Sequence, residues 1–531
     1  MKRFTTVGVC IPEKHYMVDL TKRLQEIKKM VDEGKYFTIN RGRQYGKTTT
    51  LYALTDYLEN DYEVVSLDFQ GISYSGFASE EDYVQAFCRM IKRKSISKFV
   101  IPDNIAQGIT DFIERKEHRA KMDELFDLLR GWCAESEKPL VLMIDEVDSA
   151  TNNQVFIDFL AMLRDCYISR DTEGVATFQS VILAGVTDVK HMKAKIREED
   201  QHKVNSPWNI ATDFLVDMSL SAEGIRGMLD DYEADHHTGM DTQGIASYIF
   251  SYTSGYPFLV SRICELIDTQ LVPEKLPTLS EAWTKRGVDE AVKKILSEDN
   301  TLFDSLMGKL NNYPELNKQL RDILLKGDTI AYLPDNEEQK QLRMYGLIKA
   351  RENTIVVANR IFEMRLYQKY IGESHRNEQF REDALINKSI FINDDHTLNM
   401  PLIMEHFAAS QKRIHGEADE TFLEEEGRER FLTYIAPIIN GTGTYSIEEQ
   451  TRTRLRMDVV IHYWGKEYIV ELKIWRGPRY NEEGEKQIKE YLDHFDINTG
   501  YLVSFCFNKK KESGKVKRVP IGDKTVFEVI V

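Results

Sequence analysis

Residues 36–48 read YFTINRGRQYGKT, a short apolar run followed by a loop that ends in Gly46, Lys47 and Thr48. The run Tyr36–Asn40 has the length and β-branched content of a strand, and a helical pattern follows the loop. Such a loop can bind phosphate through its backbone N–H groups, with the lysine facing the terminal phosphates and the hydroxyl binding Mg²⁺. The stretch therefore predicts a phosphate-binding loop.

A second signal lies about 97 residues further on, where the apolar run Leu140–Ile144 ends in Asp145 and Glu146. A buried strand that ends in a carboxylate would place Asp145 beside the Mg²⁺, and Glu146 could polarise the attacking water. The alternative is a surface Asp-Glu pair, and the loop upstream favours the site. The residues predicted to bind the nucleotide and its metal are Gly42, Gly46, Lys47, Thr48, Thr49 and Asp145.

Short apolar runs alternate with helical patterns over residues 36–218, which predicts an α/β fold with a parallel sheet covered on both faces. The expected strands are Tyr36–Asn40, Val64–Phe69, Leu140–Ile144, Val181–Gly185 and Phe214–Met218. Residues 222–298 read as helices interrupted at 255–257, and residues 301–371 read as helices followed by a β-hairpin. We therefore expect a core at 1–220, a helical lid at 221–299, a winged-helix module at 300–373 and a separate α/β domain at 374–531.

The C-terminal segment contains a second candidate site on a predicted hairpin of Met457–Tyr463 and Tyr468–Trp475. With Gly465-Lys466 as the turn, Asp458 would lie opposite Lys473, and Glu471 would share their face. Carboxylate oxygens of Asp458 and Glu471 suit Mg²⁺ or Mn²⁺, which would activate a water, and Lys473 could orient that water. The alternative is a charge-balancing surface cluster, although charges within an apolar strand are costly.

The loop at 41–48 resembles the R-x-R-x-[FY]-G-K-[ST] loop of AAA-like ATPases of bacteria and archaea, relatives that also lack the usual first glycine, here Arg41. The residues 183–188, 206–210 and 254–259 resemble further parts of STAND-like and origin-recognition-like members. This resemblance covers about residues 10–370 and implies ATP with Mg²⁺, a lid and a winged helix. By position, Thr187 or Asp188 would be the sensor. Arg164 and Arg170 could act as fingers on a neighbouring subunit of a homo-oligomer, or be solvated arginines.

The order Asp458, Glu471, Lys473 resembles the PD-(D/E)XK nuclease superfamily over about residues 420–507. Gln487 and Tyr491 match the Q-x-x-x-Y helix of RecB-like members, and the resemblance gives them catalytic roles. The helix around 424–432 resembles the first helix, whose glutamate often completes the metal shell; Glu429 is preferred and Glu426 is the alternative. The side chains of Arg452, Arg454 and Arg456 share parity with Asp458 and would suit backbone phosphates.

Composition limits the function less than these motifs do. The net charge of −16 argues against a protein that coats nucleic acid, but a local patch can still bind DNA. The six scattered cysteines, the lack of a signal peptide and the lack of a membrane span predict a cytoplasmic protein. We expect an ATPase and metal-dependent nuclease acting on nucleic acid, with DNA preferred. Two alternatives remain: a switch that binds nucleic acid without cutting, and a partner-sensing platform with a protein-docking winged helix.

Overall fold

The computed structural model describes residues 2–95, 99–151, 153–186, 207–272, 274–326, 330–373, 378–415, 424–439, 443–447, 459–474, 486, 488–493, 497–506 and 514–531. The chain divides into two units. Unit 1 comprises Met1–Asp231, Tyr256–Ser261 and Met344–Gly346, and unit 2 comprises Tyr232–Gly255, Arg262–Arg343 and Leu347–Val531. Across these ranges, no helix has the length and apolar character needed to span a bilayer.

Unit 1 is built on a four-stranded parallel sheet with the order β1-β4-β3-β2. Its strands are β1 (Phe37–Asn40), β2 (Glu63–Asp68), β3 (Leu140–Asp145) and β4 (Ser180–Gly185). Strands β3 and β4 are buried along their whole length, because helices cover both faces of the sheet. The predicted α/β fold with a parallel sheet is thereby confirmed.

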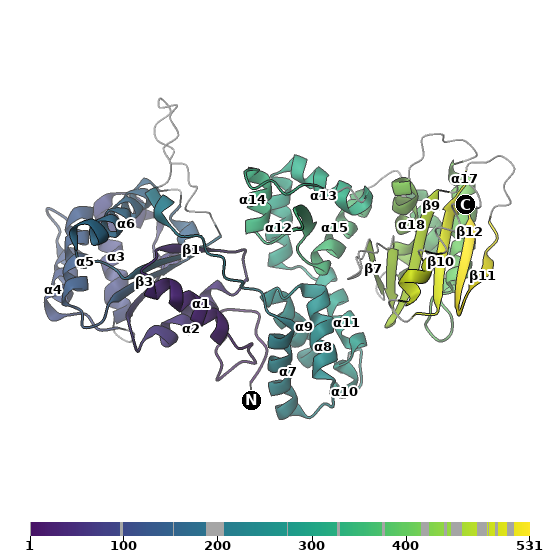
Figure 1. The fold of residues 1–531 in the computed structure, drawn as a ribbon, viewed down its shortest axis with the longest axis horizontal. Helices are drawn as coiled ribbons and strands as arrows, with labels where there is room; N and C mark the ends of the chain where they lie inside the picture. The colour runs from purple at the N-terminus through teal and green to yellow at the C-terminus, as the bar shows by residue number, and fades with distance from the viewer. Residues whose placement is uncertain are drawn as a thin grey trace. The chain divides into compact units, whose positions relative to one another are not determined.

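The two faces of this sheet have separate hydrophobic cores. Helices α1 (Thr21–Asp32) and α2 (Lys47–Leu58) pack on one face, where Leu54 is fully buried (Figure 1). The other face carries a larger core that includes Phe87 and Trp132. The helices that supply it are α3 (Glu80–Ser95), α4 (Asp103–Glu114), α5 (Met122–Glu135) and α6 (Gln154–Glu173), with the short turns η1 (Phe69–Gly71), η2 (Tyr74–Phe77), η3 (Val147–Ser149) and η5 (Pro207–Ile210).

The prediction of a fifth strand at Phe214–Met218 is wrong. Thr212 forms an isolated bridge to Phe37 of β1, and residues 213–218 have no strand assignment. The backbone carbonyls of this segment accept hydrogen bonds from arginine side chains and not from a neighbouring strand. Arg41 donates to Val216 O at 3.1 Å, and Arg23 donates to Met218 O at 2.8 Å. Phe214, Val216 and Met218 are still buried in the same core as β1, whereas Leu215 is exposed, and this alternation explains why the pattern predicts a strand.

Unit 2 begins with a helical region that confirms the expected helices and the break before residue 257. These helices are α7 (Ala222–His236, which starts in unit 1), α8 (Thr242–Thr253), α9 (Pro257–Thr269, which also starts in unit 1), α10 (Leu279–Ala282) and α11 (Lys285–Ser297). The next part comprises α12 (Thr301–Asn311), α13 (Pro314–Lys326), α14 (Glu337–Met344), the hairpin β5 (Ile348–Arg351) and β6 (Thr354–Val357), and α15 (Arg360–Glu373). The winged-helix assignment of this part and the four predicted domain boundaries stay predictions.

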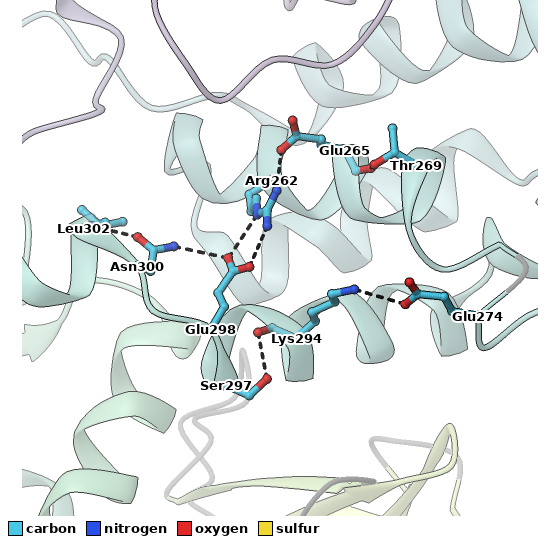
Figure 2. Close-up of polar contacts among 9 residues, drawn as sticks. All are labelled: Arg262, Glu265, Thr269, Glu274, Lys294, Ser297, Glu298, Asn300 and Leu302. Atoms are coloured by element: carbon cyan, nitrogen blue, oxygen red, sulfur yellow. Dashed lines mark hydrogen bonds and ion pairs between the residues drawn. The ribbon is translucent and has the colours of Figure 1, made fainter.

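Within unit 2, an ionic clamp joins the end of α11 to α9 (Figure 2). The Arg262 guanidinium donates to both oxygens of Glu298, at 3.1 and 2.6 Å, and to Glu265 at 2.7 Å. Asn300 donates to Glu298 at 3.5 Å and caps α12 by accepting from Leu302 N at 2.8 Å. Glu298 thus connects α9 with the start of α12.

The C-terminal part of unit 2 is a six-stranded mixed sheet with the order β11-β12-β10-β9-β8-β7. Strands β7, β8 and β9 pair antiparallel, β9, β10 and β12 pair parallel, and β11 pairs antiparallel with β12. The strands are β7 (Gly443–Ile447), β8 (Val459–Tyr463), β9 (Lys466–Ile474), β10 (Thr499–Phe505), β11 (Lys517–Ile521) and β12 (Lys524–Ile530), and the helices are α16 (Glu378–Ile386), η7 (Lys388–Phe391), α17 (Met400–His415) and α18 (Glu424–Ile439). An α/β segment at the C-terminal end is confirmed, and its nuclease character stays a prediction.

Candidate functional site

The predicted phosphate-binding loop connects β1 to α2 at the carboxyl edge of the unit 1 sheet. Gly46 precedes the first helical residue with φ +79°, a left-handed conformation that favours glycine. Helix α2 therefore starts at Lys47, so its first backbone N–H groups and the positive end of its dipole face the loop. This is the local geometry that binds phosphate.

Lys47 is buried beneath the loop, with 6% of its surface exposed. Its ammonium donates to Arg41 O and Gly42 O, each at 3.0 Å, so the loop wraps around the charge. Burial lowers the pKa of Lys47, and the carboxylates of Glu146 and Asp145 act against that shift. A buried cation that donates to two backbone carbonyl groups can exchange them for phosphate oxygens.

Thr48 and Asp145 meet across the space between α2 and β3. Thr48 Oγ1 donates to Asp145 Oδ2 at 2.6 Å, and Glu146 N donates to Asp145 Oδ1 at 2.9 Å. Burial raises the pKa of Asp145, partly offset by these two hydrogen bonds, and burial followed by the Asp145 charge raises the pKa of Glu146. Hydroxyl and carboxylate oxygens at this position fit the hard-oxygen preference of Mg²⁺.

Arg41, at the position of the usual first glycine, has a structural role. Its backbone N donates to Gly185 O at 3.2 Å, and its guanidinium reaches Asn40 O at 2.8 Å. The same group lies 5.5 Å from the centre of the Phe214 ring. The Arg41 side chain therefore connects the loop to the segment that follows η5, which a glycine at this position could not do.

Sequence reasoning missed two tyrosines that contact the loop within unit 1. Tyr256 OH donates to Arg43 O at 2.6 Å, and its ring packs edge-on against Tyr45 with centroids 4.7 Å apart. A Cβ built on Gly42 would lie 2.4 Å from Tyr345 O, so the two backbones are in close contact. Tyr256 is the middle residue of the predicted G-x-P turn, so that motif could have identified it. No sequence motif around Tyr345 predicts its contact with the loop.

Two other residues from the sequence prediction have structural partners. Thr49 Oγ1 accepts a hydrogen bond from Cys10 N at 3.2 Å, so this hydroxyl holds the N-terminal segment. Arg170 donates to Gly34 O at 2.9 Å and to Gln179 O at 3.1 Å, which is a structural clamp and not an exposed finger. The predicted sensor residues 187 and 188 lie outside the described residues.

The second candidate site contains Glu471 and Lys473 on β9, an interior strand of the mixed sheet. Glu471 is fully buried, and Lys473 Nζ lies 3.0 Å from its Oε1. Side chains alternate along a strand, so both lie on the face of Ile469, where the helical residue Tyr491 also packs. Three of the predicted catalytic residues thus share one face of the sheet.

The predicted hairpin register is wrong by two residues. The turn is Trp464-Gly465, with φ of +53° and +72°, and Val460 pairs with Ile469 and not with Glu471. The apolar pattern continues through Trp464, so the sequence places the turn one residue late. A slip of two residues leaves the side-chain faces unchanged, because the side-chain period is two.

Other residues of this prediction are not brought together by the described structure. Asp458, Gln487 and the arginines at 452, 454 and 456 lie outside the described residues. Glu429 is on α18, where Gly427 packs against Phe505 on the opposite face of the sheet from Glu471, and the assignment of Glu429 stays a prediction. Over the described ranges, no group of three or more His, Cys, Asp or Glu side chains is arranged to hold a metal ion.

Comparison with known proteins gives similarities that cover about two thirds of the chain. An uncharacterised WD repeat-containing protein, slr0143, of Synechocystis is 22% identical over 376 residues, which is 67% of this chain and 29% of that protein. The chain thus spans less than a third of the relative's length. Among solved structures, the Walker-type ATPase PABY2304 of Pyrococcus abyssi is 14% identical with a TM-score of 0.45, covering 68% of this chain and 99% of that one. Cdc6p of Pyrobaculum aerophilum is 15% identical with a TM-score of 0.34, covering 69% and 97%.

The family model described as the AAA-like domain matches residues 13–373. That range is more than half of the chain, and it contains the loop around Lys47, the Asp145 strand and the Tyr256 turn. The chain therefore belongs to the AAA-like domain family.

Proposed function

We propose that this protein couples ATP binding and hydrolysis to metal-dependent cleavage of nucleic acid, with DNA as its substrate. The proposal of ATP binding and hydrolysis, the ATP half, is supported by the family and by the geometry around Lys47. The proposal of nucleic-acid cleavage, the cutting half, is supported by the site around Glu471. The observation that carries the cutting half is a fully buried glutamate 3.0 Å from a lysine on an interior strand.

In the ATP half, each group acts on a different part of the nucleotide. Lys47 exchanges its carbonyl partners for the terminal phosphates, and the N–H groups at the start of α2 bind phosphate oxygens. Thr48 and Asp145 would hold the Mg²⁺ that accompanies the nucleotide, and that ion would supply positive charge next to the phosphates. Glu146 accepts a proton from the attacking water, and its raised pKa brings it closer to neutral pH than an ordinary glutamate.

The proposal of nucleic-acid cleavage is supported by the burial of the Glu471 carboxylate. A buried carboxylate is costly unless it is paired or binds a metal, and replacing Glu471 and Lys473 by apolar residues would remove that cost. Carboxylate oxygens suit Mg²⁺ or Mn²⁺, whose chemistry is to activate water and stabilise the scissile phosphate. Glu471 and Asp458 would hold the metal, and Lys473, Gln487 and Tyr491 would position the water and the phosphate.

The substrate follows from the arginines of the same sequence segment. Arg452, Arg454 and Arg456 alternate with apolar or small residues before Asp458, a pattern that suits backbone phosphates. The net charge of −16 makes such a local patch necessary for binding a polyanion. An assembly of several copies would let an arginine such as Arg164 reach a neighbour's ATP site.

The test of this function uses the full-length chain and two variants with different expected defects. Asp458→Ala should lose metal binding and cleavage together. Lys473→Ala should keep Mn²⁺ binding, measured by calorimetry, while cleavage slows by roughly 10²–10³-fold, as for the loss of one electrostatic transition-state contact. Cleavage by Asp458→Ala at the wild-type rate would remove the assigned site. DNA binding without cleavage by the wild type would favour the non-cutting switch.

A further inference from the structure

Glu146 has an unusual backbone conformation for the residue that is proposed to activate water. Its φ and ψ are +54° and +40°, in the left-handed region that residues other than glycine rarely adopt. Such conformations persist where surrounding contacts enforce them. The turn η3, which follows directly, supplies those contacts.

One side of η3 is tied to the end of β2. Ser149 N and Ser149 Oγ both donate to Glu146 O, at 3.2 and 3.0 Å, and Ser149 Oγ also lies 3.2 Å from Phe69 O. These hydrogen bonds close the turn behind Glu146. These hydrogen bonds do not fix the position of Glu146 relative to the phosphate-binding loop. The loop follows β1, which lies on the other side of β3 from β2 in the sheet order β1-β4-β3-β2.

The other side of η3 is tied to β4 through Asp148. Val186 N donates to Asp148 Oδ2 at 2.7 Å. A Cβ on Gly185 would lie 2.8 Å from Val147 Cγ2 and 3.1 Å from Asp148 Oδ2, so the absence of a side chain at Gly185 lets the turn approach. Asp148 is half-buried in this position.

The peptide group between Gly185 and Val186 therefore has a partner on each side. Its carbonyl accepts from Arg41 N, in the phosphate-binding loop, at 3.2 Å. Its N–H donates to Asp148, two residues after Glu146, at 2.7 Å. A peptide group is planar and rigid, with its C=O and N–H pointing in opposite directions. The group thus fixes the distance between the loop and the turn.

We infer that Asp148 is a positioning residue for ATP hydrolysis: it holds Glu146 in register with the phosphate-binding loop through the Gly185–Val186 peptide group. This inference rests on the proposed role of Glu146. The acceptor oxygen of Asp148 is the required feature, because the contact is a hydrogen bond from a neutral backbone amide. The charge of Asp148, which also acts on Lys47, is a separate property.

The variants separate these two properties. Asp148→Ala removes the acceptor, whereas Asp148→Asn removes only the charge, since an amide oxygen can still accept from Val186 N. Misplacing a catalytic group by about 1 Å costs up to roughly 10²-fold in rate. We expect kcat for ATP to fall about 10- to 100-fold in Asp148→Ala, with ATP affinity retained, and Asp148→Asn to stay within about threefold of wild type.

The deciding experiment is a double-mutant cycle with Glu146→Gln, measured by single-turnover ATP hydrolysis of the full-length chain. If Asp148 acts through Glu146, Asp148→Ala should cause no further loss in the Glu146→Gln background. An equal further loss there, or an Asn variant as slow as the Ala variant, would overturn the inference. Asp148→Ser, whose side chain is too short to reach Val186 N, gives the same readout if the Ala variant does not fold.

Failure of the inference differs from failure of the proposed function. If Glu146→Gln hydrolyses ATP as fast as wild type, the role of Glu146 is wrong and Asp148 has nothing to position. If Glu146→Gln hydrolyses ATP slowly, and Asp148→Ala hydrolyses it at the wild-type rate with normal ATP affinity, only the role of Asp148 is wrong.

Discussion

At the scale of single residues, the phosphate-binding loop depends on close backbone approaches as much as on its charged groups. Gly42 supplies one of the two carbonyls that hold Lys47, and its α-carbon faces the carbonyl of Tyr345. Neither side of this contact is a flexible side chain, so an added methyl group cannot be accommodated by a rotamer change. The backbone itself has to move.

We therefore predict that Gly42→Ala weakens both the fold and nucleotide binding. Overpacking of this kind typically costs about 1–3 kcal/mol of unfolding free energy, and the shifted carbonyl would disturb Lys47. The measurements are urea unfolding and the Kd for ATP. The control is Gly227→Ala in α7, where nothing lies within 4 Å of the added Cβ; this variant should gain about 0.5–1 kcal/mol from helix propensity. Unchanged ATP affinity in Gly42→Ala would contradict the close contact.

Residues that act through local spacing were predictable from the sequence. Lys47 and Thr48 follow a strand and a glycine, and Asp145 ends an apolar run, so their meeting follows from one strand–loop–helix unit and one neighbouring strand. The contacts of Arg41 and Tyr345 were not predictable, because each depends on segments far away in the chain. The local sequence carries no record of those partners.

At the scale of elements, polar contacts between helices decide how the helical region is held together. Arg262 and Glu298 form a two-pronged ion pair in which about a fifth of each side chain is exposed, and Glu298 raises the pKa of Arg262. The nearby pair Lys294–Glu274 in Figure 2 is more exposed, at 34% and 65%. Charge pairs gain value as water is excluded, so the two pairs should differ.

We predict that Arg262→Ala lowers the free energy of unfolding by about 1.5–3 kcal/mol, the usual loss for hydrogen bonds to charged groups. Lys294→Ala, the matched control, should cost about 0–1 kcal/mol. Urea unfolding followed by circular dichroism measures both values. Equal effects of the two substitutions would show that the clamp does not hold α9 to α11.

A second element-scale prediction concerns Asp289 on α11, whose carboxylate accepts from Tyr248 OH at 2.8 Å and from Tyr252 OH at 2.9 Å. Burial raises its pKa above 3.8, against the effects of both tyrosines and of His462 and Lys293. The folded state therefore binds the Asp289 proton more tightly than the unfolded state, and this contribution to stability is lost as pH rises through the folded pKa.

Asp289→Asn keeps an acceptor for the tyrosines and removes the titration. The stability of this variant relative to wild type should therefore rise as pH increases from about 4 and level off above the folded pKa. Unfolding free energies measured across that range provide the test. A difference that stays constant or falls with pH would show that the charged form of Asp289 is not penalised.

The elements themselves were largely predictable, and their pairing was less so. Period and turn signals located the four strands of the unit 1 sheet but only β8 and β9 of the six strands in the C-terminal sheet, because burial on one or two faces determines those patterns. The segment 214–218 shows a limit of such patterns: Phe214, Val216 and Met218 are buried as in a strand, yet arginine side chains donate hydrogen bonds to its carbonyl oxygens. The turn at Trp464 shows a second limit: sequence patterns for hairpin turns look for Asn, Asp or Gly at positive φ, and here an aromatic residue adopts that conformation.

At the scale of the whole molecule, the ATP site belongs to unit 1 and the site around Glu471 belongs to unit 2. Short pieces around Tyr256 and Tyr345 group with the phosphate-binding loop, although the chain on both sides of each piece belongs to unit 2. Nucleotide-dependent movement of the loop would therefore be transmitted along the chain into unit 2. Under the proposed function, this continuity would be the covalent route by which ATP acts on the site around Glu471.

The most direct measurement is the rate of DNA cleavage by the full-length protein in Mg²⁺ or Mn²⁺, with and without ATP, on linear, circular and single-stranded DNA. Wild type should cut and should change its rate when ATP is added. Lys47→Ala should cut at a rate that ATP does not change, because its terminal-phosphate contact is lost, and Glu471→Gln should not cut under any condition. Cleavage by Glu471→Gln at the wild-type rate, or no cleavage by wild type on any substrate, would contradict the coupling of ATP hydrolysis to nucleic-acid cleavage.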